Sequence, residues 1–314
     1  MVFRFLFLLL IFACTPKLPS LIQTSYVIET SDIGRFWEAY DSLDQATSRA
    51  DSIAIMQEVY IDQASAGFRE FLDIRAFTAE EYIQKIAAYP GFWSSVRPLT
   101  EVVVSRTDEI EAVFARYRTA LPNFKQPNIC FAIGGIRTGG TISGGYILIG
   151  TEIAAADSSV QKGELSEWMQ SVVGQTGDIT AMIAHESIHT QQRGFTGDRL
   201  IKKTINEGVA DFLSEQITGM NINYRIYDYA YAHECEIWQD WQRDLVKNPT
   251  GFRNWMYQGN NVEGRPADLG YFIGYRIAQS YYDHQENKRQ AIRDLLNRRK
   301  YEQIYEESGY APCE

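Results

Sequence analysis

Residues 178–189 read DITAMIAHESIH and contain the pattern H-E-x-x-H, with His185, Glu186 and His189 at its fixed positions. If the segment is helical, the two histidines lie about 40° apart around the axis and roughly 6 Å apart along it. Both imidazoles can then reach one metal ion. Glu186 lies about 100° around the axis from His185, where it can touch a water molecule at that ion.

A helix that merely exposes two histidines is the simpler interpretation, and two features weigh against it. The chain has only four histidines, so half of them fall in this motif. The residues before it include Ile179, Met182 and Ile183, which predicts a helix that is at least partly buried. Asp178 is a favourable N-cap and Gly194 a favourable stop for this helix.

A third metal ligand is expected on the next helix, because catalytic zinc sites use three protein ligands and one open position. Asp198 can cap a helix that runs to about Thr218 and stops at Gly219. Within this helix Glu207 and Asp211 stand four positions apart, so both carboxylates share one face. One of them can bind the metal while the other accepts the remaining N–H of a ligand histidine.

Composition excludes several classes of function. The 314 residues carry 30 Lys and Arg against 40 Asp and Glu, a formal net charge of −10. This balance argues against a nucleic-acid partner, which needs a basic face, and against attachment to anionic lipid through a basic patch. With 45% hydrophobic residues the chain can bury a substantial core. Four cysteines are too few for a disulfide scaffold.

The N-terminus has the pattern of a secretory signal. Arg4 precedes an apolar run over residues 5–13, and this run is far shorter than the roughly 20 residues of a membrane-spanning helix. The run ends in IFAC, residues 11–14, which resembles a bacterial lipobox. That resemblance implies cleavage before Cys14, acylation of Cys14, and a lipid anchor in the bacterial cell envelope. No Asp follows Cys14, which favours the outer membrane, facing the periplasm. An ordinary signal peptide with a chance cysteine is the alternative.

The remaining cysteines leave the disulfide pattern open. Acylation of Cys14 would leave Cys130, Cys235 and Cys313, an odd set that allows at most one internal bridge. Which pair forms it cannot be read from the sequence. Buried or unpaired thiols are the alternative.

The remaining sequence predicts an α+β fold that is predominantly α-helical. Helices are expected at about 79–89, after the capping box that starts at Thr78, and at 107–119. Two β-prone runs, 128–133 and 146–149, flank a glycine-rich stretch and predict a small sheet before the H-E-x-x-H helix. A phosphate-binding loop is the alternative for this stretch, but it contains no GxxxxGK[ST] pattern and no lysine.

Four regions are expected along the chain. They are a signal peptide over residues 1–13, a lipid-anchored tether over 14–30, a helical region over 31–125 and a catalytic region over 126–314. No second linker, repeat or low-complexity tract separates the last two regions. They are therefore predicted to form one compact unit.

The order of motifs resembles a known class of metallopeptidase. H-E-x-x-H followed by N-E-x-x-x-D is similar to the glutamate-zincins, whose third ligand is a glutamate on the next helix. A closer resemblance is to a family of predicted zinc-dependent proteases among bacterial lipoproteins, some of whose relatives look like gliding-motility lipoproteins. The matching pieces, spread over about residues 128–310, are YILIGTE (146–152), residues 185–189, EGVADF (207–212), WMY (255–257), RP (265–266), GYFIGY (270–275) and SGY (308–310).

This resemblance implies a zincin-like fold, one Zn²⁺ ion and a peptide or protein substrate. His185, His189 and Glu207 would be the zinc ligands, and Asp211 would orient His185. Glu186 would be the general base that takes a proton from the zinc-bound water and hands it to the leaving amine.

The second donor to the developing oxyanion stays open among three residues, His233, Tyr271 and Tyr275. Each has an alternative role in packing, because most of the 19 tyrosines are expected to be packing residues. Small glycines around Tyr271 and Tyr275 would let a helix approach the site closely. Residues 139–149 are the candidate for an edge strand that pairs with substrate, and a hairpin that only packs is the alternative.

Three functions follow from these features. The first is a zinc metallopeptidase tethered to the cell envelope as a lipoprotein. The second is a non-catalytic envelope lipoprotein of zincin fold that acts in a surface or gliding-motility assembly. The third is hydrolysis of a non-peptide amide or ester by the same metal centre.

Overall fold

The computed structural model describes residues 26–121, 123–174, 178–257 and 264–313. The expected signal peptide over 1–13, the lipidation site Cys14 and most of the expected tether lie outside the described residues. The end of that tether region, Ile28–Glu29, forms the short strand β1. No helix in the described part of the chain is long and apolar enough to cross a membrane.

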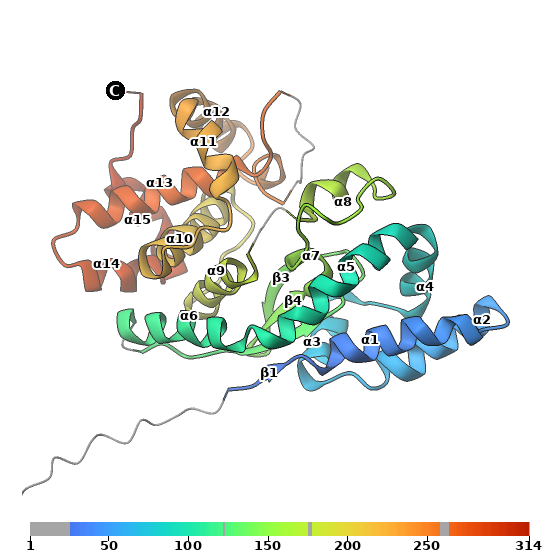
Figure 1. The fold of residues 1–314 in the computed structure, drawn as a ribbon. Coiled ribbons are helices and arrows are strands. Elements are labelled where there is room, and N and C mark those ends of the chain that lie inside the picture. Colours follow the sequence, from blue (N-terminus) through green and yellow to red (C-terminus); the bar gives the residue numbers. More distant parts are fainter. Residues whose placement is uncertain (1–25, 122, 175–177, 258–263, 314) are drawn as a thin grey trace, which may run out of the picture.

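The fold is mostly helical, with a small sheet between two groups of helices (Figure 1). The helices between strands β1 and β2 are α1 (Ser31–Ser42), α2 (Arg49–Ile55), α3 (Ala66–Arg75), α4 (Ala79–Ala88), α5 (Pro90–Val102) and α6 (Thr107–Ala120). The later helices are α7 (Thr151–Ala154), α8 (Glu167–Val172), α9 (Ile179–Gln191), α10 (Leu200–Thr218), α11 (Tyr224–Ala232), α12 (Glu234–Lys247), α13 (Leu269–His284), α14 (Lys288–Leu295) and α15 (Tyr301–Ser308).

The sheet has four strands in the order β1-β2-β4-β3. Strands β2 (Asn128–Ala132) and β4 (Tyr146–Gly150) confirm the two predicted β-prone runs, and they pair in parallel with Ile129 opposite Ile147. Strand β1 is parallel to β2, whereas β3 (Gly140–Ser143) is antiparallel to β4 and forms one edge. The predicted edge-strand region, 139–149, therefore contains a real edge strand.

The first group of helices packs on this sheet through a large apolar core. Aromatic side chains from α1, α3 and α5 are fully buried in it, together with the inner residues of β2 and β4. The hydroxyls of Tyr60 and Tyr82 both donate hydrogen bonds to the carbonyl oxygen of Ile133, just after β2. These bonds fix the helices against the end of the strand that leads into the glycine-rich stretch.

Helix α4 begins at a capping box, and helix α5 begins at a proline. The predicted capping box at Thr78 is present, since Thr78 and Glu81 exchange hydrogen bonds at the start of α4. Pro90, which directly follows the helix predicted at about 79–89, occupies the first turn of α5. Proline suits this position because the first backbone N–H groups of a helix have no partner within it.

The second core forms where α10 crosses α13, with α9 lying between α10 and the sheet (Figure 1). Glycines make this crossing close. A Cβ atom on Gly208 would lie 1.9 Å from the carbonyl carbon of Gly274, and one on Gly274 would lie 1.9 Å from the carbonyl oxygen of Thr204. No larger residue fits at either position, so the sequence GYFIGY does bring α13 close to the helix that carries Glu207.

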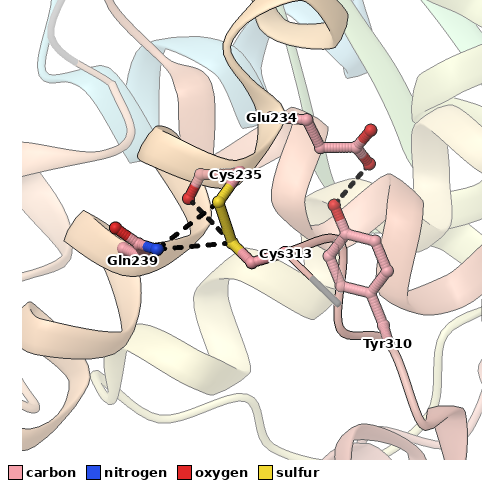
Figure 2. The surroundings of a disulfide bond; sticks show 5 residues. All are labelled: Glu234, Cys235, Gln239, Tyr310 and Cys313. Atoms are coloured by element: carbon pink, nitrogen blue, oxygen red, sulfur yellow. Dashed lines mark hydrogen bonds between the residues drawn. A yellow bond between two sulfur atoms is a disulfide. The ribbon is translucent and has the colours of Figure 1, made fainter.

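Cys235 and Cys313 form a disulfide that ties the start of α12 to the C-terminal end of the chain (Figure 2). Beside it, Tyr310 donates a hydrogen bond to Glu234 on the same helix. Cys130 is buried in β2 as a free thiol, so one bridge forms among the three cysteines. Disulfides persist in oxidising compartments such as the bacterial periplasm, which agrees with the expected envelope location.

Candidate metal site

The two helices that carry the predicted ligands begin and end close to where the sequence placed them. Asp178 caps α9, since its Oδ1 accepts a hydrogen bond from the backbone N–H of Thr180. Helix α10 stops at Gly219, which adopts a left-handed conformation with φ of 76°. Its expected cap, Asp198, does not act as one, because the helix begins at Leu200 after Arg199. This local difference leaves the positions of Glu207 and Asp211 on α10 unchanged.

Three predicted ligands converge on one point between α9 and α10. The Nε2 atoms of His185 and His189 are 3.0 Å apart, and Glu207 Oε2 lies 3.4 Å from the first and 3.0 Å from the second. The three residues are only 4%, 8% and 6% exposed. They form a buried His₂Glu triad that can hold a metal ion.

The outer nitrogen of each imidazole has an acceptor that fixes its proton. His185 Nδ1 lies 2.7 Å from Oδ1 of Asp211, which is fully buried. His189 Nδ1 lies 2.8 Å from Oε1 of Gln192, whose own amide nitrogen donates to the carbonyl oxygen of Asn206. Each Nδ1 must therefore carry the proton, and each neutral ring turns an Nε2 lone pair toward the centre.

Three electron-pair donors that face one another can hold a cation between them. The residues present fit a divalent metal, because imidazole and carboxylate are both suitable ligands for zinc and several other divalent ions. The identity of the ion does not follow from this ligand set. When no metal is bound, a proton takes the place of the cation. Burial alone lowers the pKa of His185, but hydrogen bonds to Asp211 and Glu207 raise this pKa well above its usual value.

The carboxylates of the site are held from behind by residues that sequence reasoning did not assign. The second oxygen of Glu207 accepts hydrogen bonds from the Tyr257 hydroxyl at 2.7 Å and from the side chain of Asn206 at 3.1 Å. The second oxygen of Asp211 accepts from Asn223 at 2.8 Å and from the Tyr227 hydroxyl at 2.9 Å. These contacts leave one oxygen of each carboxylate directed at the histidines.

Some of these supporting residues had a signal in the sequence. Tyr257 ends the quoted WMY motif, and Asn206 opens the N-E-x-x-x-D pattern. Gln192 lies three positions after His189, but its pairing requires the end of α9 to be placed first. Tyr227 belongs to a tyrosine-rich run in which spacing alone selects no member.

Glu186 faces a cavity beside the triad rather than the triad's centre. The cavity measures about 670 Å³ and is also lined by His185, His189, Glu207 and residues of strand β3. Glu186 makes no hydrogen bond or ion pair with any described residue, and burial raises the pKa of its carboxyl group. A Cβ atom on Gly140 would lie 2.9 Å from Glu186 Oε1, so the glycine lets the edge strand approach this carboxylate.

Of the three candidate oxyanion donors, the structure brings one to the cavity. Tyr271 lines it, with its ring 6.3 Å from that of His185. Tyr275, one turn further along α13, instead packs against Phe212 and is not among the described residues that line the cavity. His233 lies between α11 and α12, where it stacks on Tyr229 and contacts Glu236. It is also absent from the cavity lining.

These features define a helical α+β protein with a buried His₂Glu triad that can hold a metal ion beside an open cavity. The model of a lipoprotein family described as gliding motility protein GldB matches residues 28–312. The chain therefore belongs to this family. No curated protein and no solved structure matches it. The expected link to gliding-motility lipoproteins is thus confirmed, whereas the peptidase and zincin parts of the resemblance stay predictions.

Proposed function

We propose that this gliding-motility-family lipoprotein is a zinc-dependent hydrolase that cleaves peptide bonds at the site formed by His185, His189 and Glu207. The observation that carries the proposal is Glu186. Its carboxylate is unpaired and faces the cavity beside three buried atoms that together can hold a cation. A purely structural metal site has no use for such a group, since structural sites are closed by their ligands.

Each residue has a defined task in this proposal. A zinc ion held by the triad would act as a Lewis acid on the substrate carbonyl. Glu186 would accept a proton from the attacking water and pass it to the leaving amine, and its raised pKa suits both transfers. Tyr271 lines the same cavity and would donate to the developing oxyanion. Asp211 would hold His185 in the ligand tautomer.

The edge strand supports a peptide as the substrate. Strand β3 pairs with β4 along one edge only, and its residues Thr141 and Ile142 line the cavity. The free backbone groups of an edge strand can pair with an extended peptide. Because a Cβ atom on Gly140 would lie 2.9 Å from Glu186 Oε1, a peptide bound along β3 would pass close to the proposed general base.

A second candidate function is a non-catalytic role in a gliding-motility assembly, and the family match favours it. In that case a metal bound by the triad would stabilise α9 against α10. The two candidates differ in what they require of Glu186. The structural role needs the three ligands alone, whereas hydrolysis also needs the general base.

The test compares Glu186→Gln with wild type on a peptide library prepared from whole-cell protein. We expect the variant to keep its zinc and to lose cleavage by about a hundredfold or more, the usual effect of removing a general base. Glu306→Gln is the matched control, because Glu306 is an exposed glutamate on α15, remote from the cavity lining. Full cleavage by Glu186→Gln would refute the mechanism. Zinc-loaded wild type that cleaves no peptide would favour the second candidate.

A further inference from the structure

Arg75 is a half-buried cation of the site cavity that forms no hydrogen bond or ion pair through its guanidinium with any described residue. It ends helix α3, and its side chain lines the same cavity as Glu186 and the triad. The Nε atom is inaccessible to solvent and has no hydrogen-bond partner among the described residues. The guanidinium also forms no ion pair with any of them.

The other cations that line the cavity are all engaged by protein groups. Arg298 donates to Asn206, to Gln192 and to backbone carbonyls. Lys203 lies 3.8 Å from Asp198 and over the ring of Phe252. Arg75 lines the same cavity as these residues, but its guanidinium has no hydrogen-bond or ion-pair partner among the described residues.

Arg137, the fourth of these cations, holds Arg75 in place without neutralising it. It donates a 2.7 Å hydrogen bond to the backbone carbonyl of Arg75, lies over the ring of Phe77 and contacts Glu81 at 3.6 Å. Burial, and then the charge of Arg137, lower the pKa of Arg75, although the carboxylate of Glu186 acts in the opposite direction. The two arginines therefore concentrate positive charge next to the glycine-rich stretch that leads into β3.

An inaccessible N–H donor without a hydrogen-bond partner, such as the Nε of Arg75, costs free energy, so its presence needs a reason. Binding sites commonly retain such groups because a ligand supplies the missing partner. Guanidinium is also the side-chain group best suited to pair with a carboxylate, through two parallel hydrogen bonds.

We propose that Arg75 is the receptor for a carboxylate of the peptide bound in this cavity. This inference rests on the proposed function, of which it names the substrate class. The carboxylate comes either from the C-terminus of the peptide or from an Asp or Glu side chain. Both sources present the same planar acceptor to the guanidinium. Among the described residues, four cationic and three acidic side chains line the cavity, whereas the chain as a whole carries a net charge of −10.

Equilibrium dialysis with three pools of N-acetylated tetrapeptides tests this assignment by binding alone. One pool has amidated C-termini and no acidic residue, the second has amidated C-termini and one Glu, and the third has free C-termini and no acidic residue. We expect wild-type protein to bind at least one anionic pool about tenfold or more tightly than the neutral pool. A hydrogen bond to a charged group commonly contributes an affinity difference of this size. The retained pool identifies the source of the carboxylate.

Arg75→Gln should abolish this preference and should leave the thermal midpoint unchanged or raise it, because an unpaired charge is removed. Arg69→Gln is the matched control, since Arg69 is exposed on the same helix and does not line the cavity. It should retain the preference of wild type.

Equal retention of all pools by wild type, no retention of any pool, or an undiminished preference in Arg75→Gln would overturn the inference. A lowered thermal midpoint in Arg75→Gln would assign the residue a structural role instead. The result is independent of catalysis. A protein that binds anionic peptides through Arg75 but cleaves none would refute the proposed hydrolysis and leave this inference standing.

Discussion

His185 Nδ1 and Asp211 Oδ1 lie 2.7 Å apart, which links two helices across 26 positions of sequence. Asp211 is fully buried, and its other oxygen accepts hydrogen bonds from Asn223 and Tyr227. The carboxylate is therefore fixed on one side by two donors and fixes the imidazole on the other. This arrangement determines which nitrogen of His185 is free to bind a cation.

Replacing Asp211 by Asn should weaken zinc binding about 10- to 100-fold, the usual effect of losing a carboxylate behind a ligand histidine. The amide keeps the shape of the side chain but lacks the charge that makes the imidazole a stronger ligand. Competition with a chromogenic chelator measures the affinity. Asp228→Asn is the control, because Asp228 is exposed on α11. Equal affinity of Asp211→Asn and wild type would show that Asp211 has no effect on the metal.

The metal-free site should make stability depend on pH in two opposite ways. Hydrogen bonds to Asp211 and Glu207 outweigh burial and raise the pKa of His185. The contribution of protonated His185 to folding stability is therefore complete at a pH below the pKa of histidine in the unfolded chain, about 6.5. This contribution is lost as the pH rises through the pKa of His185 in the folded protein. Burial raises the pKa of Glu207, but the two histidines hold it well below its usual value. Its contribution is lost as the pH falls through that lowered pKa.

Zinc should accordingly stabilise the protein most at alkaline pH, where no proton occupies the site. Thermal midpoints of zinc-loaded and chelator-treated protein, measured from about pH 5 to about pH 9, give the size of this effect. The difference between the two should grow with pH. A difference that stays constant across this range would contradict the pKa shifts described for His185 and Glu207.

Gly208→Ala should destabilise the protein by about 3 kcal/mol or more, because the new methyl group would collide with backbone rather than with a movable side chain. The clash would be with the backbone of Gly274 on α13. Gly208 directly follows the proposed ligand Glu207 in the sequence. Gly34→Ala is a matched helical control with nothing within 4 Å of the new Cβ atom. It should stabilise by about 0.5–1 kcal/mol. Urea unfolding compares the two, and similar effects of both changes would contradict the close crossing.

The site could be predicted from the sequence as far as its geometry depends on helix periodicity. The spacing of His185 and His189, and of Glu207 and Asp211, places each pair on one helix face whatever the tertiary structure. The convergence of the two pairs needed only that successive helices pack together. The order of the motifs, H-E-x-x-H followed by N-E-x-x-x-D, also indicated Glu207 as the third residue of the triad. This is why the triad was found in a chain that no solved structure matches.

What sequence reasoning missed depends on contacts between distant segments. Arg75 lies 110 positions before His185 and belongs to no motif, so only the packing of α3 beside β3 brings it to the cavity. Tyr271 and Tyr275 share the same motif, and one turn of α13 decides which of them reaches the cavity. His233 was a candidate mainly because histidines are scarce. A rare histidine suggests a metal ligand only when a second ligand stands at a fixed spacing from it, and His233 belongs to no motif of this kind.

The central claim is that His185, His189 and Glu207 hold one divalent metal ion, and elemental analysis of purified protein tests it most directly. Wild type and the control His233→Ala should each contain close to one zinc per chain, while His185→Ala should contain almost none. His233→Ala is a suitable control because this histidine lies outside the cavity lining. Wild-type protein without zinc or any other divalent metal, or His185→Ala with as much metal as wild type, would contradict the account.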